Sequence, residues 1–288
     1  MVKKPLVIYH NNCPDGFTAA WAVWRVLGDE AEYQAMNYGQ HLAPLEDHEH
    51  RRVIFVDFSL PRVELEELIA RGAQVEVYDH HKTAEAELRD LVSAKVVFDM
   101  ERSGAGIAWD EFNLPIRLDF PPVMWRRPRP RLVSYVEDRD LWRWALDSSR
   151  AVSEWLFSIP RTFQEWNNAS DELERDFGGV LKIGEALLRL KRERVAKVCE
   201  NVRWLSFGDV KVPVINHAWD MSEIGEYLCE QFPDAPCGGY YFDRADKRQW
   251  GFRSSGDFDV SALCKQYGGG GHRAAAGFTT EIGWLPPA

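Results

Sequence analysis

Acidic and imidazole side chains follow three apolar runs in the first third of the sequence, and together they could hold metal ions. The runs LVIY, VIFV and VEVY lead into His10, Asp57 and Asp79, and Asp79 is followed by His80 and His81. Carboxylate oxygens and imidazole nitrogens in one set suit manganese, iron or zinc better than calcium. If the runs are strands of one sheet, these groups converge on one edge, where the acids would repel each other without a cation. The pattern therefore favours a shared metal site over isolated caps and turns.

The loop after the first apolar run adds further groups of this kind. Residues 10–16, HNNCPDG, combine the imidazole of His10, the thiol of Cys13 and the carboxylate of Asp15. Gly16 permits a close approach of the backbone to a ligand. Asp15 could reach the same metals as His10, and the alternative is a capping role for the helix expected to begin near Phe17.

Alternating strand and helix patterns predict a mostly parallel sheet as the scaffold. Strand-like runs at 6–9, 53–56, 75–78 and 96–98 enclose helical patterns at 17–27 and 61–71. Residues 171–202 show helical periodicity, as one helix or as two broken at Gly178-Gly179. Four strand-like runs, within 202–253, and two helical patterns, at 222–231 and 260–267, then indicate a smaller α+β domain. We expect an α/β protein with a metal-binding domain over 1–170, a helical linker over 171–201 and a second domain over 202–288.

Composition restricts the partners. The chain has 288 residues, 45% of them apolar, enough for the cores of two domains. Its 35 basic and 45 acidic residues give a formal charge of −10, which argues against broad adhesion to duplex nucleic acid. No apolar run approaches the roughly 20 residues of a membrane span and no signal peptide is recognisable, so we expect a cytoplasmic protein without membrane contact. The five cysteines are widely spaced and are expected to be reduced.

Five motifs, in chain order, resemble those of the DHH family of phosphoesterases. The first four are HNNCPDG at 10–16, VDFS at 56–59, DHH at 79–81 and EDRDLW at 137–142. In the tail, GGGGH at 268–272 followed by AAAG at 274–277 is similar to the GGGH signature of the DHH-associated C-terminal domain. Each motif alone is short, but five in this order are specific. The resemblance points to nano-RNase (oligoribonuclease) and bisphosphate-nucleotide phosphatase members.

The resemblance implies two divalent cations, with Mn²⁺ expected first and Fe, Co, Zn or Mg as alternatives. The metal ligands that it implies are His10 for the first cation, Asp57 for both, and Asp15, His80 and Asp138 for the second. Asp140 is an alternative to Asp138, since both lie in the EDRD motif. Asp79 is expected to orient an imidazole, and His81 to face the substrate phosphate or the bridging water. Together with Asp57, these two residues are the expected catalytic group.

Cys13 departs from the family pattern, in which an acid usually stands at this position of the DxDG motif. Two interpretations stay open. A thiolate ligand of the first metal would shift selectivity from magnesium toward iron, zinc or cobalt. Alternatively, Cys13 is a buried neutral thiol and the first metal is held weakly.

The tail supplies the expected substrate-binding residues. Backbone N–H groups of Gly269, Gly270 and Gly271 could wrap an anion, reinforced by His272 and Arg273, although a flexible glycine hinge is the alternative. Arg253 resembles the arginine with which such domains hold a nucleotide phosphate. The segment MERSGAG at 100–106 could also present N–H groups to a phosphate, or could be an ordinary strand-to-helix turn.

The resemblance implies a hydrolase that cleaves phosphodiester or phosphomonoester bonds by two-metal hydroxide attack. The expected substrates are short single-stranded oligonucleotides, dinucleotides or nucleotide phosphates, which makes exonuclease or oligoribonuclease activity an expectation. A homodimer is compatible with this reading. The alternatives are a phosphoanhydride hydrolase of the exopolyphosphatase or pyrophosphatase type, which the GGGH tail disfavours, and a non-catalytic nucleotide sensor, which Cys13 suggests.

Overall fold

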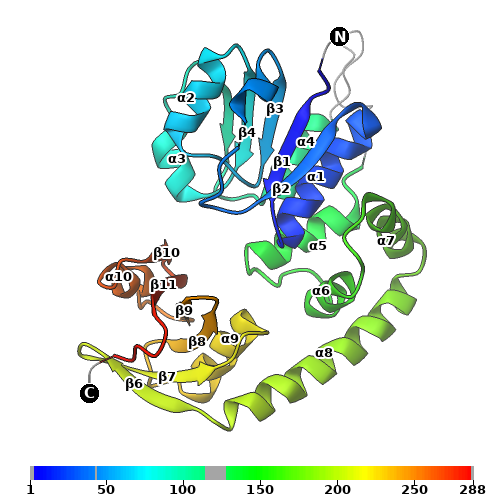
Figure 1. Ribbon diagram of the computed structural model, residues 1–288. Coiled ribbons are helices and arrows are strands. Elements are labelled where there is room, and N and C mark those ends of the chain that lie inside the picture. Colours follow the sequence, from blue (N-terminus) through cyan, green and yellow to red (C-terminus); the bar gives the residue numbers. More distant parts are fainter. Residues whose placement is uncertain (1–2, 43, 114–127, 287–288) are drawn as a thin grey trace. The chain divides into compact units, whose positions relative to one another are not determined.

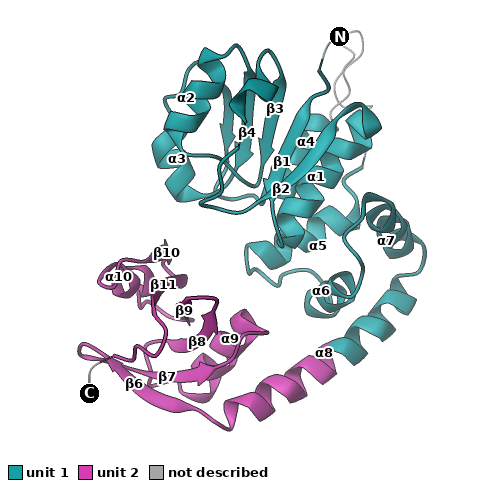
Figure 2. Ribbon diagram, viewed as in Figure 1, with its two compact units in different colours: residues 1–187 teal, residues 188–288 magenta. Residues whose placement is uncertain are grey.

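Two compact units make up the chain, Met1–Leu187 and Leu188–Ala288 (Figures 1 and 2). The computed structural model describes residues 3–42, 44–113 and 128–286. Each unit has its own sheet, and the long helix α8 (Phe177–Cys199) contributes residues to both. Within the described residues, no helix is long and apolar enough to cross a membrane.

The first unit contains the predicted parallel sheet, which is confirmed. Its five strands run in the order β2-β1-β3-β4-β5, and all neighbours pair in parallel. The strands are β1 (Leu6–His10), β2 (Glu32–Met36), β3 (Arg52–Val56), β4 (Gln74–Asp79) and β5 (Lys95–Phe98). Since β3 lies between β1 and β4, the ends of these three strands are neighbours at the carboxyl edge of the sheet.

Helices cover both faces of this sheet (Figure 1). Successive strand residues point to opposite faces, so Val7 and Ile54 enter one core while Ile8 and Phe55 enter the other. The second core is closed by α2 (Arg62–Ala70) and α3 (Lys82–Leu88). Six of the described helices contribute to the first core: α1 (Pro14–Leu27), α4 (Gly104–Phe112), α5 (Arg131–Asp140), α6 (Ser149–Phe157), α7 (Phe163–Arg175) and the start of α8. Two short 3₁₀ turns, Gly28–Glu30 and Leu45–His48, complete the described elements of this unit.

The second unit is the predicted smaller α+β domain. Its sheet has the order β10-β11-β9-β8-β7-β6. Among the described strands of this second sheet, β7 and β8 are the only parallel pair. Val195 and Cys199 of α8 share one core with α9, and α10 packs into the other. The elements are β6 (Arg203–Phe207), β7 (Val210–Asn216), α9 (Met221–Gln231), β8 (Gly238–Arg244), β9 (Lys247–Arg253), α10 (Val260–Lys265), β10 (Gly270–His272) and β11 (Ala275–Glu281).

Candidate metal centre

The carboxyl edge of the first sheet brings the expected ligands together. Three overlapping groups have ligand atoms that lie within 4.8 Å of one another. Asp57 belongs to two of them and His80 also belongs to two, so the groups form one continuous cluster. The groups are His10 with Cys13 and Asp57, then Asp15 with His80 and Asp140, and finally Asp57 with Asp79, His80 and His81.

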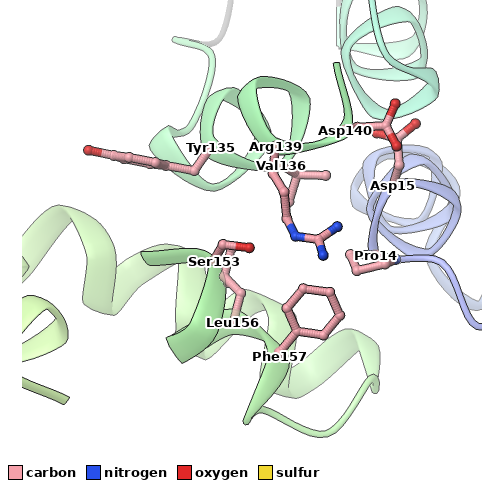
Figure 3. Close-up of a pocket in the computed structure, with 9 residues that line it drawn as sticks. All are labelled: Pro14, Asp15, Tyr135, Val136, Arg139, Asp140, Ser153, Leu156 and Phe157. Carbon is pink, nitrogen blue, oxygen red and sulfur yellow. The ribbon is translucent and has the colours of Figure 1, made fainter. Parts of the chain in front are cut away.

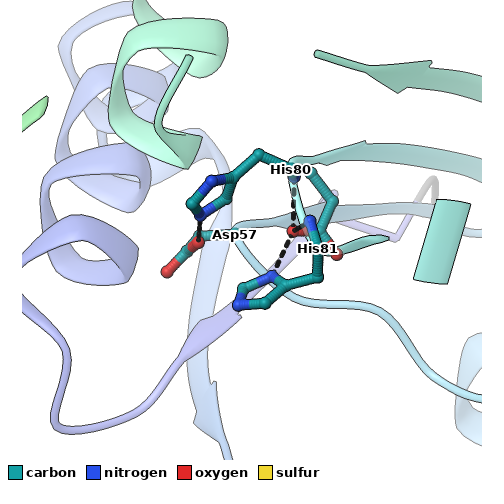
Figure 4. A group of neighbouring side chains, drawn as sticks. Asp57, His80 and His81 are labelled. Atoms are coloured by element: carbon teal, nitrogen blue, oxygen red, sulfur yellow. Dashed lines mark hydrogen bonds and ion pairs between the residues drawn. The ribbon is translucent and has the colours of Figure 1, made fainter. Parts of the chain in front are cut away.

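Asp57 is the centre of this cluster. It follows β3 with a left-handed φ of 53°, a conformation that few residues other than glycine adopt without cost. Its Oδ1 lies 3.2 Å from His80 Nε2 (Figure 4). Its Oδ2 lies 3.7 Å from His10 Nδ1. Burial would raise the pKa of Asp57, but the two imidazoles outweigh it, so the pKa is lowered and the carboxylate stays charged.

Two glycines allow this packing. A side chain on Gly104 would collide with Asp57, and one on Gly16 would come within 2.5 Å of the carbonyl oxygen of His10. The first turns of α4 and α1 can therefore approach the strand ends closely. Both glycines stand in the segments 100–106 and 10–16 that the sequence singled out.

His80 faces three carboxylates at once. Its Nε2 lies 3.2 Å from Asp57, 3.5 Å from Asp140 and 3.8 Å from Asp15. Burial alone would lower the pKa of His80, but these carboxylates raise it to about 10. The imidazolium thus supplies positive charge to an acidic pocket, a role that a cation with the imidazole as ligand could take over.

Asp15 and Asp140 are two acids of the cluster whose pKa is raised. Burial of the two carboxyl groups is the main cause that raises their pKa, and repulsion by other acids of the cluster raises it further. The pKa of Asp15 lies well above its usual range, and that of Asp140 is raised to about 6. Asp15 Oδ1 accepts the N–H of Ala105 at 3.1 Å. Asp15 Oδ2 and Asp57 Oδ2 are buried and have no hydrogen-bond partner among the described residues. Two buried oxygens that lack a donor fit a site built for cations.

The structure places Asp140, and not Asp138, in the cluster. The carboxylate of Asp138 accepts the N–H groups of Ala145 at 2.9 Å and Leu146 at 3.3 Å, which follow α5. Asp138 was the first expectation from the sequence and Asp140 its alternative. The difference arises because two positions along a helix point to different sides, and a sequence without its helix bounds does not say which side faces the sheet.

Asp79 orients the imidazole of His81. Its Oδ1 lies 2.6 Å from His81 Nδ1 and also accepts the N–H of His80 at 2.7 Å. Burial would lower the pKa of His81, but Asp79 raises it. The expected orienting contact is therefore made to His81, while His80 turns toward the acids.

Cys13 lies at the N-cap of α1 and belongs to the cluster through its group with His10 and Asp57. Burial and the nearby acids, first Asp57 and then Asp140 and Asp15, raise the pKa of its thiol well above the usual value. The thiol is thus neutral in the metal-free molecule, and its position still allows a bond to a metal that displaces the proton. Both interpretations of Cys13 stay open.

The segment 100–106 is a support for the acids. The N–H of Ser103 donates to Glu137 at 3.1 Å, and the N–H of Gly106 donates to the hydroxyl of Ser103 at 3.2 Å. With the N–H of Ala105 bound to Asp15, these donors are engaged inside the protein. This use of the donors favours the second of the two interpretations, an ordinary strand-to-helix turn. Glu137 was not singled out from the sequence, and its place in EDRD was the available signal.

The expected substrate-binding residues lie in the second unit. Arg253 ends β9 and donates from Nη2 to the hydroxyl of Ser222 at 3.1 Å. The glycine run is partly a strand, because β10 pairs with β11, which was not expected for a hinge or a free loop. Gly269 precedes this strand, Gly270, Gly271 and His272 form it, and Arg273 follows it and is tied to the loop at Asp257.

Comparison with known proteins supports the fold. No family model matches the sequence. An uncharacterized protein of Acanthamoeba polyphaga mimivirus is 27% identical over 303 residues, covering 98% of this chain and 69% of that protein. RecJ of Thermus thermophilus in complex with Mn²⁺ is similar in structure, with 18% identity and a TM-score of 0.53; the match covers 97% of this chain and 50% of RecJ. The DHH domain of a member of the s1p family of ribosomal proteins gives 16% identity and a TM-score of 0.52 over 97% of this chain and 83% of that one.

Proposed function

We propose that this chain, which has the fold of DHH-domain proteins, is a metal-dependent phosphoesterase that acts on short oligonucleotides, dinucleotides or nucleotide phosphates. The observation that carries the proposal is the position of Asp57, whose two oxygens face His10 on one side and His80 on the other. One carboxylate between two ligand groups suits a bridge between paired cations. The fold likeness to RecJ, solved with Mn²⁺, supports the choice of metal.

In this proposal each side chain of the cluster has a distinct task. His10, Asp57 and Cys13 would hold one divalent cation, and Asp15, Asp57, His80 and Asp140 would hold the other. When bound, the cations would activate a water and neutralise the phosphoryl oxygens. Asp140 takes the place first given to Asp138, because only Asp140 reaches the cluster.

Asp79 and His81 would serve the substrate. The contact of 2.6 Å between Asp79 Oδ1 and His81 Nδ1 fixes the ring and keeps a proton on Nδ1. The opposite nitrogen, Nε2, is then held in one direction for the phosphate or the attacking water. This arrangement supports a positioning and proton-handling role for His81.

The second unit would hold the remainder of the substrate. Arg253 offers a guanidinium fork for a phosphate. The expected contribution of the Gly269 N–H is not made, because this group donates to the carbonyl oxygen of Cys264 at 2.9 Å. His272 is exposed at the end of β10.

The test is turnover of a substrate panel by the purified protein with saturating Mn²⁺, together with metal analysis. The panel contains a dinucleotide, a nucleoside 3′,5′-bisphosphate, pyrophosphate and polyphosphate. Asp57→Asn should lower kcat/KM more than about a hundredfold, because outer-shell changes alone can reach that size. Asp29→Asn, at an exposed carboxylate, is the matched control.

Three results would overturn the proposal. An Asp57→Asn protein with full activity would remove the bridge from the mechanism. Hydrolysis of pyrophosphate or polyphosphate alone would favour the phosphoanhydride alternative. Nucleotide binding without any turnover would favour a sensor.

A further inference from the structure

Two arginines gather around one exposed aromatic ring next to the cluster. The guanidinium carbon of Arg139 lies 4.3 Å from the ring centre of Phe157, and that of Arg161 lies 6.0 Å from the same ring centre. Arg139 belongs to α5, Phe157 ends α6, and Arg161 stands in the short loop before α7. The contact with the ring holds both cations at one place on the first unit.

This place adjoins the proposed metal ligands. Arg139, Phe157 and Pro14 line a small cavity together with Asp15 and Asp140. The guanidinium of Arg139 lies over the ring of Phe157 and beside Pro14 (Figure 3). The cavity measures about 20 Å³, room for one water, so it cannot enclose a nucleotide. Any larger ligand must therefore meet the guanidinium groups from the solvent side.

The charge of Arg161 interacts with that of Arg139 and with Cys13 of the cluster. Loss of solvent lowers the pKa of Arg161; Cys13 opposes that shift and the Arg139 cation adds to it. An anion that binds beside two neighbouring cations lowers the free energy of their mutual repulsion. In a chain with a formal charge of −10, a pair of neighbouring arginines next to acids is a local exception that suits an anionic ligand.

We propose that Arg139 and Arg161 bind a second phosphate of the substrate, separate from the phosphate that is hydrolysed. The inference rests on the proposed function and narrows its substrate class to nucleotides that carry an additional phosphate. The chemistry is the planar guanidinium fork, which matches phosphate oxygens with two donors at a time. Arg139 and Arg161 would thereby select substrates by charge at a fixed distance from the cluster.

The experiment compares one dinucleotide with and without a terminal 5′-phosphate, in Mn²⁺. The ratio of kcat/KM for the two forms should be about tenfold or more in the wild type, the size of one charge-assisted contact. Arg161→Gln should bring the ratio close to one, and Arg161→Lys should keep part of it. Arg161 lies in an exposed loop, so these changes do not threaten the core. Arg175→Gln, at the exposed end of α7, should keep the full ratio.

A binding measurement separates this inference from the proposed function. Calorimetry with the same two dinucleotides in EDTA needs no turnover, and there Arg161→Gln should weaken only the phosphorylated form, again about tenfold. Absence of turnover in the wild type would contradict the phosphoesterase but leave this binding difference to be measured. Equal binding of both forms, or a full preference in Arg161→Gln, would overturn the role of the arginines. A nucleoside 3′,5′-bisphosphate in place of the dinucleotide shows whether the second phosphate is recognised on a single nucleoside.

Discussion

Asp138 and Asp140 show how two identical side chains acquire different tasks in one helical turn. They are two positions apart in α5, so their side chains leave the helix about 200° apart. Asp138 accepts two N–H groups of the following loop, whereas Asp140 Oδ2 lies 3.5 Å from His80. The Asp138 carboxylate stabilises the loop after α5. The Asp140 carboxylate adds negative charge to a cluster that already contains other acids.

Substitution of the two acids by alanine should therefore separate stability from metal binding. Asp138→Ala should lower the free energy of unfolding by about 1 to 2 kcal/mol, because two N–H donors lose their acceptor, and should keep Mn²⁺ affinity. Asp140→Ala should lower Mn²⁺ affinity more than about tenfold with little loss of stability. Urea unfolding without metal and calorimetric titration with Mn²⁺ measure the two quantities. A loss of metal affinity in Asp138→Ala alone would reverse the assignment.

The chemistry of the site could be predicted at this scale, but not every direction of a side chain. His10, Asp57 and Asp79 stand directly after apolar runs, and parallel strands bring such positions to one edge. Which imidazole Asp79 orients depends on the turn after β4, where Oδ1 accepts both the backbone of His80 and the ring of His81. A pattern of residue types contains no information about that turn.

Glu137 joins two elements and so fixes the position of Asp57. Its carboxylate accepts from Arg102 at 3.1 Å and from the N–H of Ser103 at 3.1 Å, and it forms an ion pair with Arg129 at 2.9 Å. These contacts tie α5 to the start of α4, where Gly104 packs on Asp57. The support is electrostatic and therefore depends on pH.

The pH dependence has a defined sign. Burial would raise the pKa of Glu137, but Arg129, the N–H of Ser103 and Arg102 lower it below its usual 4.5. The stabilisation is then complete above pH 4.5 and is lost as the pH falls through the lower value of the folded state. Glu137→Gln should lower the free energy of unfolding by about 2 kcal/mol at neutral pH, and the difference from wild type should shrink in acid.

Urea unfolding between neutral pH and pH values below 4.5 measures this difference. Glu185→Gln, at an exposed position of α8, serves as the control and should show no such trend. A Glu137→Gln difference that stays constant across the range would show that the charge does not matter.

Elements with an apolar pattern were predictable, and elements without one were not. Strand β2 escaped because Glu32, Gln34 and Ala35 are exposed at the sheet edge, so the segment lacks a buried run. The expected break at Gly178-Gly179 lies earlier, at Asp176 between α7 and α8. Its Oδ1 accepts the N–H of Gly179 at 2.9 Å, which places both glycines in the first turn of the new helix. Asp176 caps α8, and the two glycines, which suggested a break, lie inside the helix.

The whole molecule divides its proposed work between two units with separate cores. Arg253 lies in the second, where its stem packs against Gly225 of α9 and its Nη2 donates to Ser222. These contacts hold the guanidinium in place, as expected for a group that binds a phosphate. The candidate metal ligands among the described residues, by contrast, all belong to the first unit.

Arg253→Ala should therefore raise KM for a dinucleotide about tenfold and change kcat less. Mn²⁺ affinity should stay at the wild-type value, because no metal ligand is altered. Steady-state kinetics and calorimetry provide the two readouts, and Arg244→Ala, at the exposed end of β8, is the control. A fall in kcat with unchanged KM would place Arg253 in the chemical step instead.

Helix α8 sets a limit on how the protein can be divided. The unit boundary falls after Leu187, inside the helix, and Val180 packs into the core of one unit while Val195 packs into the core of the other. A cut at this boundary would leave two stubs of about a dozen residues or fewer, a length at which isolated helices are marginal in water. Fragments made at this junction would each carry a truncated part of α8 at one end. The two units are therefore best expressed together as one chain.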